Sequence, residues 1–293
     1  MSTPLAWPLR REYLAPSLTL RGREFAWGAR TFIMGIINAS PDSFSGDGLG
    51  ADPAAAARQA AAFEEAGADI LDVGGQSSRP GAPVLDAAEE ARRVIPCIEA
   101  ARAASALPIS VDTFHAAVAD EALRAGADAV NDIWGLRFDD DLPAVVARHG
   151  AALIAMHNQR GRAFHDVAAD IAAGFRETLA ICERSGIPHA RVILDPGFGF
   201  GWTPGQNLEM LRRLPELWEF RLPLLLGTSR KSTIGLVLDA PVDDRLEGTA
   251  ASVAVAIAAG ADLIRVHDVA AMARVVRVAD AIVRANWSPP TSP

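Results

Sequence analysis

The sequence contains few cysteines and no long apolar run, and each absence excludes a class of protein. Cys97 and Cys182 are the only cysteines and lie far apart in helix-like stretches, so neither a disulfide framework nor a zinc cluster is indicated. No stretch of about 18 uninterrupted apolar residues is present, and the N-terminus lacks an apolar signal core. We therefore expect a soluble, cytoplasmic protein without a membrane partner.

The chain also lacks any block rich in lysine and arginine, and its formal net charge is −8. Nucleic-acid binding needs a concentrated positive field, so a nucleic-acid partner is not expected. A small molecule is the more natural ligand. An anionic substrate remains possible if a few cationic side chains converge in one cleft.

Short runs rich in Ile, Val and Leu recur along the 293 residues, half of which are apolar. Their near-continuous apolar character is typical of parallel strands that are covered on both faces. Eight such runs are found. They are TFIMGIIN from Thr31, DILDVGG from Asp69, PISVDT from Pro108, AVNDIW from Ala129, ALIAMH from Ala152, RVILDPG from Arg191, PLLLGTS from Pro223 and LIRVHD from Leu263.

Amphipathic, Ala-rich segments separate these runs and carry helix start and stop signals. Asp52-Pro53 opens one helix and Gly67 closes it, while Gly126, Gly150 and Gly260 end others. Eight alternating strand and helix units predict an α/β protein, a (β/α)8 TIM barrel. An open doubly wound sheet is the alternative, but no GxGxxG turn follows the first strand.

The two ends of the chain fall outside the repeat. Within residues 1–30, SLTLRGREFAW reads as two short strands around Arg21-Gly22, which predicts an N-terminal β-hairpin at the bottom of the barrel. Residues 31–287 form the predicted barrel. Residues 288–293 read as a flexible, Pro-rich tail.

Polar side chains stand at the ends of all eight predicted strands. In such barrels the chemistry is built from strand C-termini and the loops after them, so these residues are expected to converge on one mouth. A helix cap or a solvated loop is the alternative reading for any single member. The set is Asn38, Gln76, Ser77, Ser78, Arg79, Asp112, Asn131, Asp132, His157, Asp195, Ser229, Arg230, Lys231, Arg265, His267 and Asp268.

Asp112 and Asp195 lie inside apolar strand sequence, where a carboxylate is costly unless it is paired or hydrogen-bonded. A heterocycle rich in N–H groups would satisfy both, and Asn131 can donate as well as accept. Capping of the following helices is the alternative, most plausible for Asp112.

Positive charge comes from Arg79, Lys231, Arg265 and His267, with Arg230 beside them. This combination suits a diphosphate, because Arg offers bidentate hydrogen bonds, Lys a mobile charge and His a further donor. A surface lysine is the alternative for Lys231. Asn38 supplies a neutral oxygen of the kind that Mg²⁺ accepts, and Phe198 and Phe200 lie in a Gly-rich loop suited to an aromatic substrate.

Taken together, the motifs resemble those of the dihydropteroate synthase family, in the family's order and over nearly the whole barrel from Ile33 to about Ile282. They are MGIINASPDSFSGDG at Met34, DVGGQSSRPGA at Asp72, SVDT at Ser110, NDIWG at Asn131, MHNQRG at Met156, DPGFGFG at Asp195, GTSRKS at Gly227 and RVHD at Arg265.

The resemblance implies a transferase of folate biosynthesis that joins a pterin diphosphate to p-aminobenzoate with Mg²⁺, is a sulfonamide target and acts as a homodimer. Its implied pterin ligands are Asp112, Asn131, Met156, Asp195 and Lys231. Its implied diphosphate ligands are Asn38, Ser78, Arg79, Arg265 and His267, with Asn38 also on the metal. Its implied p-aminobenzoate site is Ser78, Arg79, Pro80, Phe200 and Ser229. Its implied catalytic residues are Asp195, Lys231, Arg265 and His267.

The sequence departs from the family pattern in the loops. Gln76 replaces the usual glutamate, Ser78 the usual threonine and Trp202 the lysine expected after GFG, and the first loop reads SGDG. Two alternatives therefore stand beside the synthase. One is a non-catalytic pterin-binding paralogue, for which Trp202 is the best support, and the other is a pterin-dependent methyltransferase with a corrinoid partner.

Overall fold

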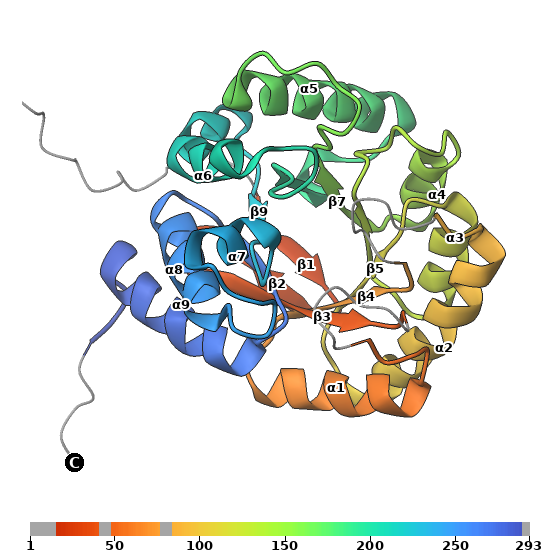
Figure 1. The fold of residues 1–293 in the computed structure, drawn as a ribbon. Helices are drawn as coiled ribbons and strands as arrows, with labels where there is room; N and C mark the ends of the chain where they lie inside the picture. The colour runs from red at the N-terminus through yellow and green to blue at the C-terminus, as the bar shows by residue number, and fades with distance from the viewer. Residues whose placement is uncertain (1–15, 41–47, 77–83, 289–293) are drawn as a thin grey trace, which may run out of the picture.

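The computed structural model of the protein describes residues 16–40, 48–76 and 84–288, and it confirms the predicted barrel. Eight parallel strands alternate with helices, which surround the strands as a ring (Figure 1). The strands are β3 (Phe32–Asn38), β4 (Ile70–Gly74), β5 (Ile109–Asp112), β6 (Ala129–Asp132), β7 (Ala152–Met156), β8 (Val192–Asp195), β9 (Leu225–Leu226) and β10 (Leu263–Val266). The helices are α1 (Pro53–Glu65), α2 (Ala87–Ala104), α3 (Ala116–Ala125), α4 (Leu142–His149), α5 (Val167–Ser185), α6 (Pro204–Arg213), α7 (Ser232–Leu238), α8 (Leu246–Ala258) and α9 (Val269–Val283).

The barrel closes between β8 and β9, which stand at the two ends of the spatial strand order. Hydrogen-bonded neighbours follow the order β8-β7-β6-β5-β4-β3-β10-β9. A parallel bridge between Leu194 and Leu224 joins β8 to the segment before β9, where the Leu194 N–H donates to the Pro223 carbonyl at 2.9 Å. Regular pairing in this segment is short and covers Leu225–Leu226, which pair with β10.

The helix signals in the sequence correspond to observed helix ends. The Asp52 carboxylate accepts from the Ala54 N–H at 2.9 Å and caps α1, whose first residue is Pro53. Gly126 and Gly150 end α3 and α4 in the left-handed conformation, with φ of 112° and 59°. Among the helices of the described residues, none is both long and apolar enough to cross a membrane.

Side chains alternate between the two faces of each strand, and this alternation divides the apolar core. Leu71, Val130 and Leu153 belong to the large cluster that includes the surrounding helices. Their neighbours Ile70 and Ala129 belong to a separate cluster inside the barrel. A strand's period of two therefore determines which polar residues further along reach the interior.

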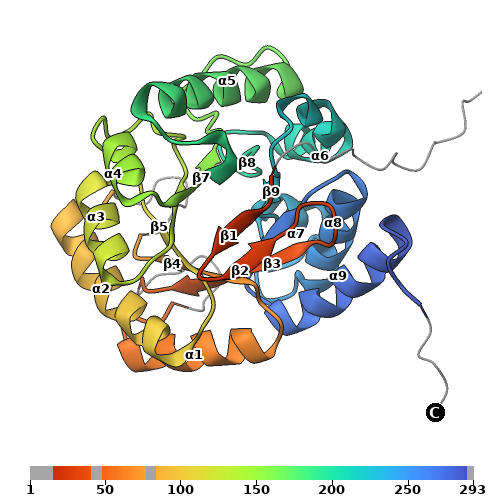
Figure 2. The same ribbon diagram turned by 180° about the vertical axis from the view of Figure 1, so that it is seen from behind.

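The predicted hairpin forms at the N-terminal end of the barrel. Strand β1 (Leu18–Leu20) pairs antiparallel with β2 (Arg23–Phe25), and Arg21 and Gly22 both have positive φ, as a tight two-residue turn requires. Leu18, Leu20 and Phe25 pack against the apolar residues inside the barrel. Figure 2 shows the hairpin lying across this end, so the opposite mouth is the one available to ligands.

Candidate active site

The strand period brings many of the predicted polar residues to one place, but not Asp132 or His157, which have the opposite parity. The Asp132 carboxylate accepts from the Trp134 and Leu136 N–H groups, as in the alternative capping reading, and the His157 ring packs against Gly174 of α5. On β4, β6, β8 and β10, the residues two positions beyond the inner apolar residues are polar, and strand pairing sets Asp112 beside Asn131 and Met156 beside Asp195. Gly74 lies between Asn38 and Asp112 in the register. These side chains come from separated parts of the chain but face the same mouth, as the sequence predicted.

Arg265 on β10 is the centre of the polar network in this mouth. Its Nε donates to Asp72 Oδ2 at 2.6 Å, and its Nη2 donates to Asp112 Oδ2 at 2.6 Å. The Asn131 amide donates to the same Asp72 oxygen at 3.0 Å, and the Ser110 hydroxyl also donates to Asp72. One guanidinium thus holds two carboxylates and, through Asp72, the amide beside them.

Asp72 and Ser110 belong to the site but were not predicted from the sequence. Asp72 is fully buried in ILDVG, so the reasoning that singled out Asp112 applies to it equally. It was overlooked because it lies two residues before the end of its strand. Asp72 lies two residues after Ile70 on the same strand, so its side chain points to the inside of the barrel as that of Ile70 does. This spacing of two is the sequence signal that identifies Asp72.

Burial and neighbouring charges change how these carboxyls titrate. Burial raises the pKa of Asp112 to about 7; the Arg265 charge opposes this rise and the Asp72 charge adds to it. Burial also raises the pKa of Asp195, and Lys231 opposes that rise. The Asp112 carboxyl can therefore lose or gain a proton close to neutral pH.

Lys231 lies after β9 and reaches across to the loop after β8. Its Nζ donates to the Phe198 carbonyl and lies 4.7 Å from the centre of the Phe200 ring. Burial lowers the pKa of Lys231 to about 8, an effect that Asp195 opposes. Gly199 has a φ of +85°, and a Cβ there would lie 3.0 Å from Lys231 Cδ, so glycine suits both the turn and this approach.

An apolar wall stands beside the carboxylates. Phe114, Ile133, Met156 and Phe200 form one buried cluster, against which Trp134 packs. Phe200 and Met156 were expected to line the ligand site, and both lie in this cluster. A flat ring system could pack here while its N–H groups face acceptors in the mouth.

Ser229 and His267 form a further pair beside Arg265. The Ser229 hydroxyl oxygen lies 2.9 Å from His267 Nδ1 and accepts from the His267 backbone N–H at 3.2 Å. Arg230 is less open to a ligand than the sequence suggested, because its guanidinium pairs with Asp268 at 2.9 and 2.5 Å.

The remaining predicted residues differ in what the structure says of them. Asn38 ends β3 and is half-buried at the mouth. Ser78, Arg79 and Pro80 lie outside the described residues, so their predicted roles stay predictions. Gln76 accepts from the Leu85 N–H at 2.6 Å and so uses the hydrogen-bonding capacity expected of it.

Trp202 packs into the core of the loop after β8. It is 8% exposed, and its ring centre lies 5.7 Å from that of His157 and 6.4 Å from that of Phe164. The residue that replaces the family's lysine thus makes apolar contacts, whereas the pterin residues implied by the resemblance are all in place around the mouth.

Comparison with known proteins identifies the family. The family model described as "Pterin binding enzyme" matches residues 34–267. The dihydropteroate synthase of Clostridium beijerinckii is 42% identical over 268 residues, which cover 91% of this chain and 100% of that protein. The synthase of Synechocystis is 44% identical, over 93% of this chain and 97% of its own.

Two solved structures show the same fold. A dihydropteroate synthase from Clostridium difficile, crystallised with pteroic acid, has a TM-score of 0.84 and 44% identity, over 89% of this chain and 99% of that one. The Yersinia pestis synthase in a sulfonamide drug complex has a TM-score of 0.87 and 37% identity, over 92% and 100%. The chain belongs to the dihydropteroate synthase family.

Proposed function

We propose that the chain condenses 6-hydroxymethyl-7,8-dihydropterin diphosphate with p-aminobenzoate to give 7,8-dihydropteroate and diphosphate. The observation that carries this function is the group of buried carboxylates around Asn131, set against the wall of Met156 and Phe200. Related enzymes were crystallised with pteroic acid and with 4-aminobenzoic acid, the product-like and substrate ligands of this reaction.

The pterin ring suits the carboxylates. Asp112 and Asp195 accept from ring N–H and exocyclic amine groups, and Asn131 donates or accepts on the same edge. Met156 packs against one face of the ring. A cation forming on the pterin during the reaction is stabilised by the negative charge of Asp195.

The chemistry needs no covalent enzyme intermediate. The bond between the pterin methylene carbon and the diphosphate oxygen breaks, and the amine nitrogen of p-aminobenzoate forms a bond to that carbon and releases a proton. Arg265 and His267 lie at the end of β10, where the guanidinium charge of Arg265 and the N–H groups of both side chains stabilise the departing diphosphate. Lys231, at the Phe200 wall, completes the set of catalytic side chains.

Mg²⁺ is proposed as the metal of the diphosphate. Mg²⁺ binds through one or two protein oxygens together with waters and substrate phosphates, and the half-buried Asn38 amide at the mouth fits that donor set. No group of three or more His, Cys, Asp or Glu suited to a metal is found in the described part of the chain. When bound with the diphosphate, the ion would neutralise charge on the leaving group.

The p-aminobenzoate site is proposed beside the pterin, at the rim. Phe200 provides a ring face and Ser229 a hydroxyl at this level of the mouth. The family resemblance adds Ser78, Arg79 and Pro80, which lie outside the described residues, to this proposed site.

A homodimer is proposed from the exposed apolar surface of α7, α8 and α9. Val278 and Ile282, four residues apart on α9, are 62% and 63% exposed. Val255 on α8 and Leu236 and Val237 on α7 are also exposed. Large apolar patches on a protein surface mark interaction sites, and a second copy of the chain would cover these three neighbouring helices.

The reaction is tested by measuring diphosphate release and dihydropteroate formation with Mg²⁺ and both substrates. A sulfonamide added to the assay is expected to raise the apparent KM for p-aminobenzoate, because it competes at the same subsite. Absence of dihydropteroate when both substrates and Mg²⁺ are present, or methyl transfer from methyltetrahydrofolate to a corrinoid protein, would contradict the proposed function.

A further inference from the structure

Arg160 lies at the mouth but belongs to none of the sets derived above. It stands in the loop after β7, and its Cζ lies 4.9 Å from the centre of the Phe200 ring. Lys231 Nζ lies 4.7 Å from the same ring centre. Two cations thus flank one aromatic side chain of the proposed p-aminobenzoate site. Lys231 comes from the loop after β9, whereas the half-buried Arg160 comes from the loop after β7.

The backbone around Arg160 is locked to the loop after β8. The His157 N–H donates to the Asp195 carbonyl at 2.8 Å, and the Gln159 N–H donates to the Phe200 carbonyl at 3.1 Å. Gly201 has a φ of +86°, and a Cβ there would lie 2.5 Å from the backbone nitrogen of Arg160. The loop that carries Arg160 and the loop that carries Phe200 are therefore in direct backbone contact.

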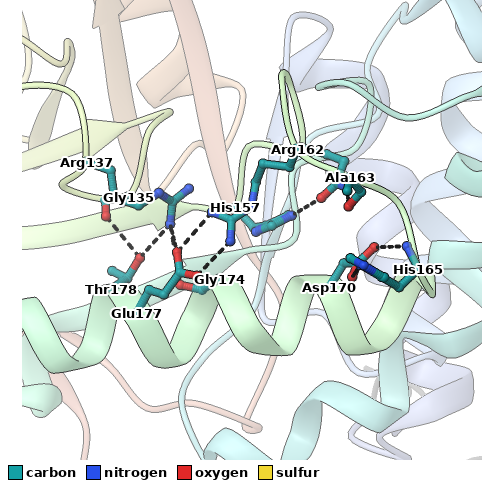
Figure 3. Close-up of polar contacts among 11 residues, drawn as sticks. Gly135, Arg137, His157, Arg162, Ala163, His165, Asp170, Gly174, Glu177 and Thr178 are labelled. Carbon is teal, nitrogen blue, oxygen red and sulfur yellow. Dashed lines mark hydrogen bonds and ion pairs between the residues drawn. The ribbon is translucent and has the colours of Figure 1, made fainter.

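The same loop is anchored on its other side to α5. Arg162 makes a bidentate pair with Glu177 of α5 at 2.9 and 2.7 Å (Figure 3). Within the loop, Gln159 Nε2 donates to the Ala163 carbonyl at 3.0 Å, and Asn158 Oδ1 accepts from the Arg160 N–H at 3.1 Å. The Arg160 side chain thus extends from a loop that is held in place before any ligand arrives, which reduces the ordering cost of binding.

Partial burial strengthens the attraction of the Arg160 guanidinium for an anion. Loss of water lowers the pKa of this guanidinium, which nevertheless stays protonated as arginines do. A guanidinium that has already given up part of its hydration gains more from a nearby anion than one in open water.

The position of the loop selects which anion this is. In the closed barrel β7, which Arg160 follows, lies opposite β3, which carries the proposed diphosphate residue Asn38. Strands β8 and β9 separate β7 from β10, at whose end Arg265 and His267 lie. In p-aminobenzoate the carboxylate is at the end of the ring opposite the reacting amine. With the amine directed at the pterin, the carboxylate points out to the rim, where Arg160 adjoins Phe200.

We propose that Arg160 is a specificity-determining residue that pairs with the carboxylate of the arylamine substrate. This inference rests on the proposed function. It predicts that the enzyme prefers p-aminobenzoate over its neutral analogue p-aminobenzamide, which offers the same amine and ring without the negative charge.

The test compares kcat/KM for these two amines in the wild-type enzyme, Arg160→Gln and Arg160→Lys. In Arg160→Gln we expect kcat/KM for p-aminobenzoate to fall about tenfold, since a charge-assisted hydrogen bond is lost at a partly exposed site. The value for p-aminobenzamide and the KM for the pterin diphosphate are expected to stay within about twofold. Arg160→Lys should restore most of the preference.

Arg162→Gln is the matched control, because it removes a charge from the same loop while leaving Arg160 in place. Loosening of the loop by this change is expected to affect both amines alike and to leave their ratio unchanged. Equal losses for both amines in Arg160→Gln, or a wild-type ratio in that variant, would overturn the inference. A wild-type enzyme that makes no dihydropteroate would instead refute the proposed function itself.

Discussion

At the scale of single residues, the mouth depends on a shared arrangement of charge. Arg265 binds two carboxylates at once, and Asp72 also receives hydrogen bonds from Asn131 and Ser110. Asp72 therefore orients the Asn131 amide and the Arg265 guanidinium, which are the proposed pterin-binding and catalytic groups. We propose that Asp72 positions these groups and does not itself contact the substrate.

Asp72→Asn is expected to lower both stability and pterin affinity. The substitution removes a buried negative charge 2.6 Å from the Arg265 guanidinium. Breaking one partner of a buried pair costs about 3 kcal/mol, reduced here because Arg265 keeps Asp112. Urea unfolding and pteroate titration measure the two effects, and Asp170→Asn on the outer helix α5 serves as a control; unchanged pteroate affinity in Asp72→Asn would contradict the positioning role.

Lys231 predicts a specific pH dependence of stability. Its pKa is lowered from 10.5 to about 8 in the folded protein, so between these values the unfolded chain holds a proton that the folded one has lost. The contribution of this group to the free energy of unfolding is therefore present above the unfolded pKa and is lost as pH falls through about 8.

Urea unfolding at several pH values between about 7 and 10 measures this contribution. The difference in unfolding free energy between the wild type and Lys231→Met, which cannot titrate, should change across that range in favour of the wild type at high pH. Parallel pH profiles for the two proteins would show that the pKa of Lys231 is not lowered.

At the scale of elements, the positions of the strands and helices could be predicted from the sequence, but the contacts between loops could not. Alternating apolar runs and helix caps such as Asp52 locate the eight units, because each signal is local in sequence. The approach of Gly201 to Arg160 has no local signal, since it depends on how two separate loops pack. From the sequence, Trp202 in place of the family's lysine was expected to alter the cleft. In the structure, tertiary packing buries Trp202 against His157.

The site residues divide in the same way. Asp112 and Asp195 could be found because a charge within an apolar run is unusual, and Phe200 because it lies in a Gly-rich loop. Asp72 could have been found by strand parity. The partners of Arg265 could not be predicted, because three strands far apart in the sequence must close into a barrel before these side chains meet.

Gly201→Ala tests the contact between the β7 and β8 loops. The added Cβ would lie 2.5 Å from the Arg160 nitrogen at a φ of +86°, so the two loops must separate. We expect kcat/KM for p-aminobenzoate to fall by at least about tenfold while far-UV circular dichroism stays that of the wild type.

Gly205→Ala is the matched control for this change. Gly205 lies in the first turn of α6, and a Cβ there meets nothing within 4 Å. Alanine at this helical position is expected to leave activity unchanged and to stabilise slightly, by up to about 1 kcal/mol. Equal activity of the two alanine variants would show that the loop contact is not needed.

At the scale of the whole molecule, the two ends of the barrel have separate roles. The hairpin covers the N-terminal end with Leu18, Leu20 and Phe25, while the mouth collects the polar residues. Helices α7, α8 and α9 carry exposed apolar side chains. All three helices belong to the ring around the strands (Figure 1). Assembly through this outer surface would leave both the hairpin and the mouth in place.

The double variant Val278→Glu, Ile282→Glu is expected to be monomeric. Two added charges on the exposed face of α9 oppose burial against a second copy. Light scattering coupled to size-exclusion chromatography measures the mass, with Val84→Glu as the control because Val84 is similarly exposed, at 61%, outside these helices. A wild-type protein that elutes as a monomer would refute the dimer.

The most direct test of the central claim is a comparison of dihydropteroate formation by the wild type, Asp195→Asn and Lys231→Ala, with Mg²⁺ and both substrates present. We predict one diphosphate released per dihydropteroate in the wild type and a loss of kcat/KM of about a hundredfold or more in each variant, because each removes a charge that acts on the reacting pterin. Pterin binding without product in the wild type, or wild-type rates in both variants, would contradict the assignment of the condensation to this mouth.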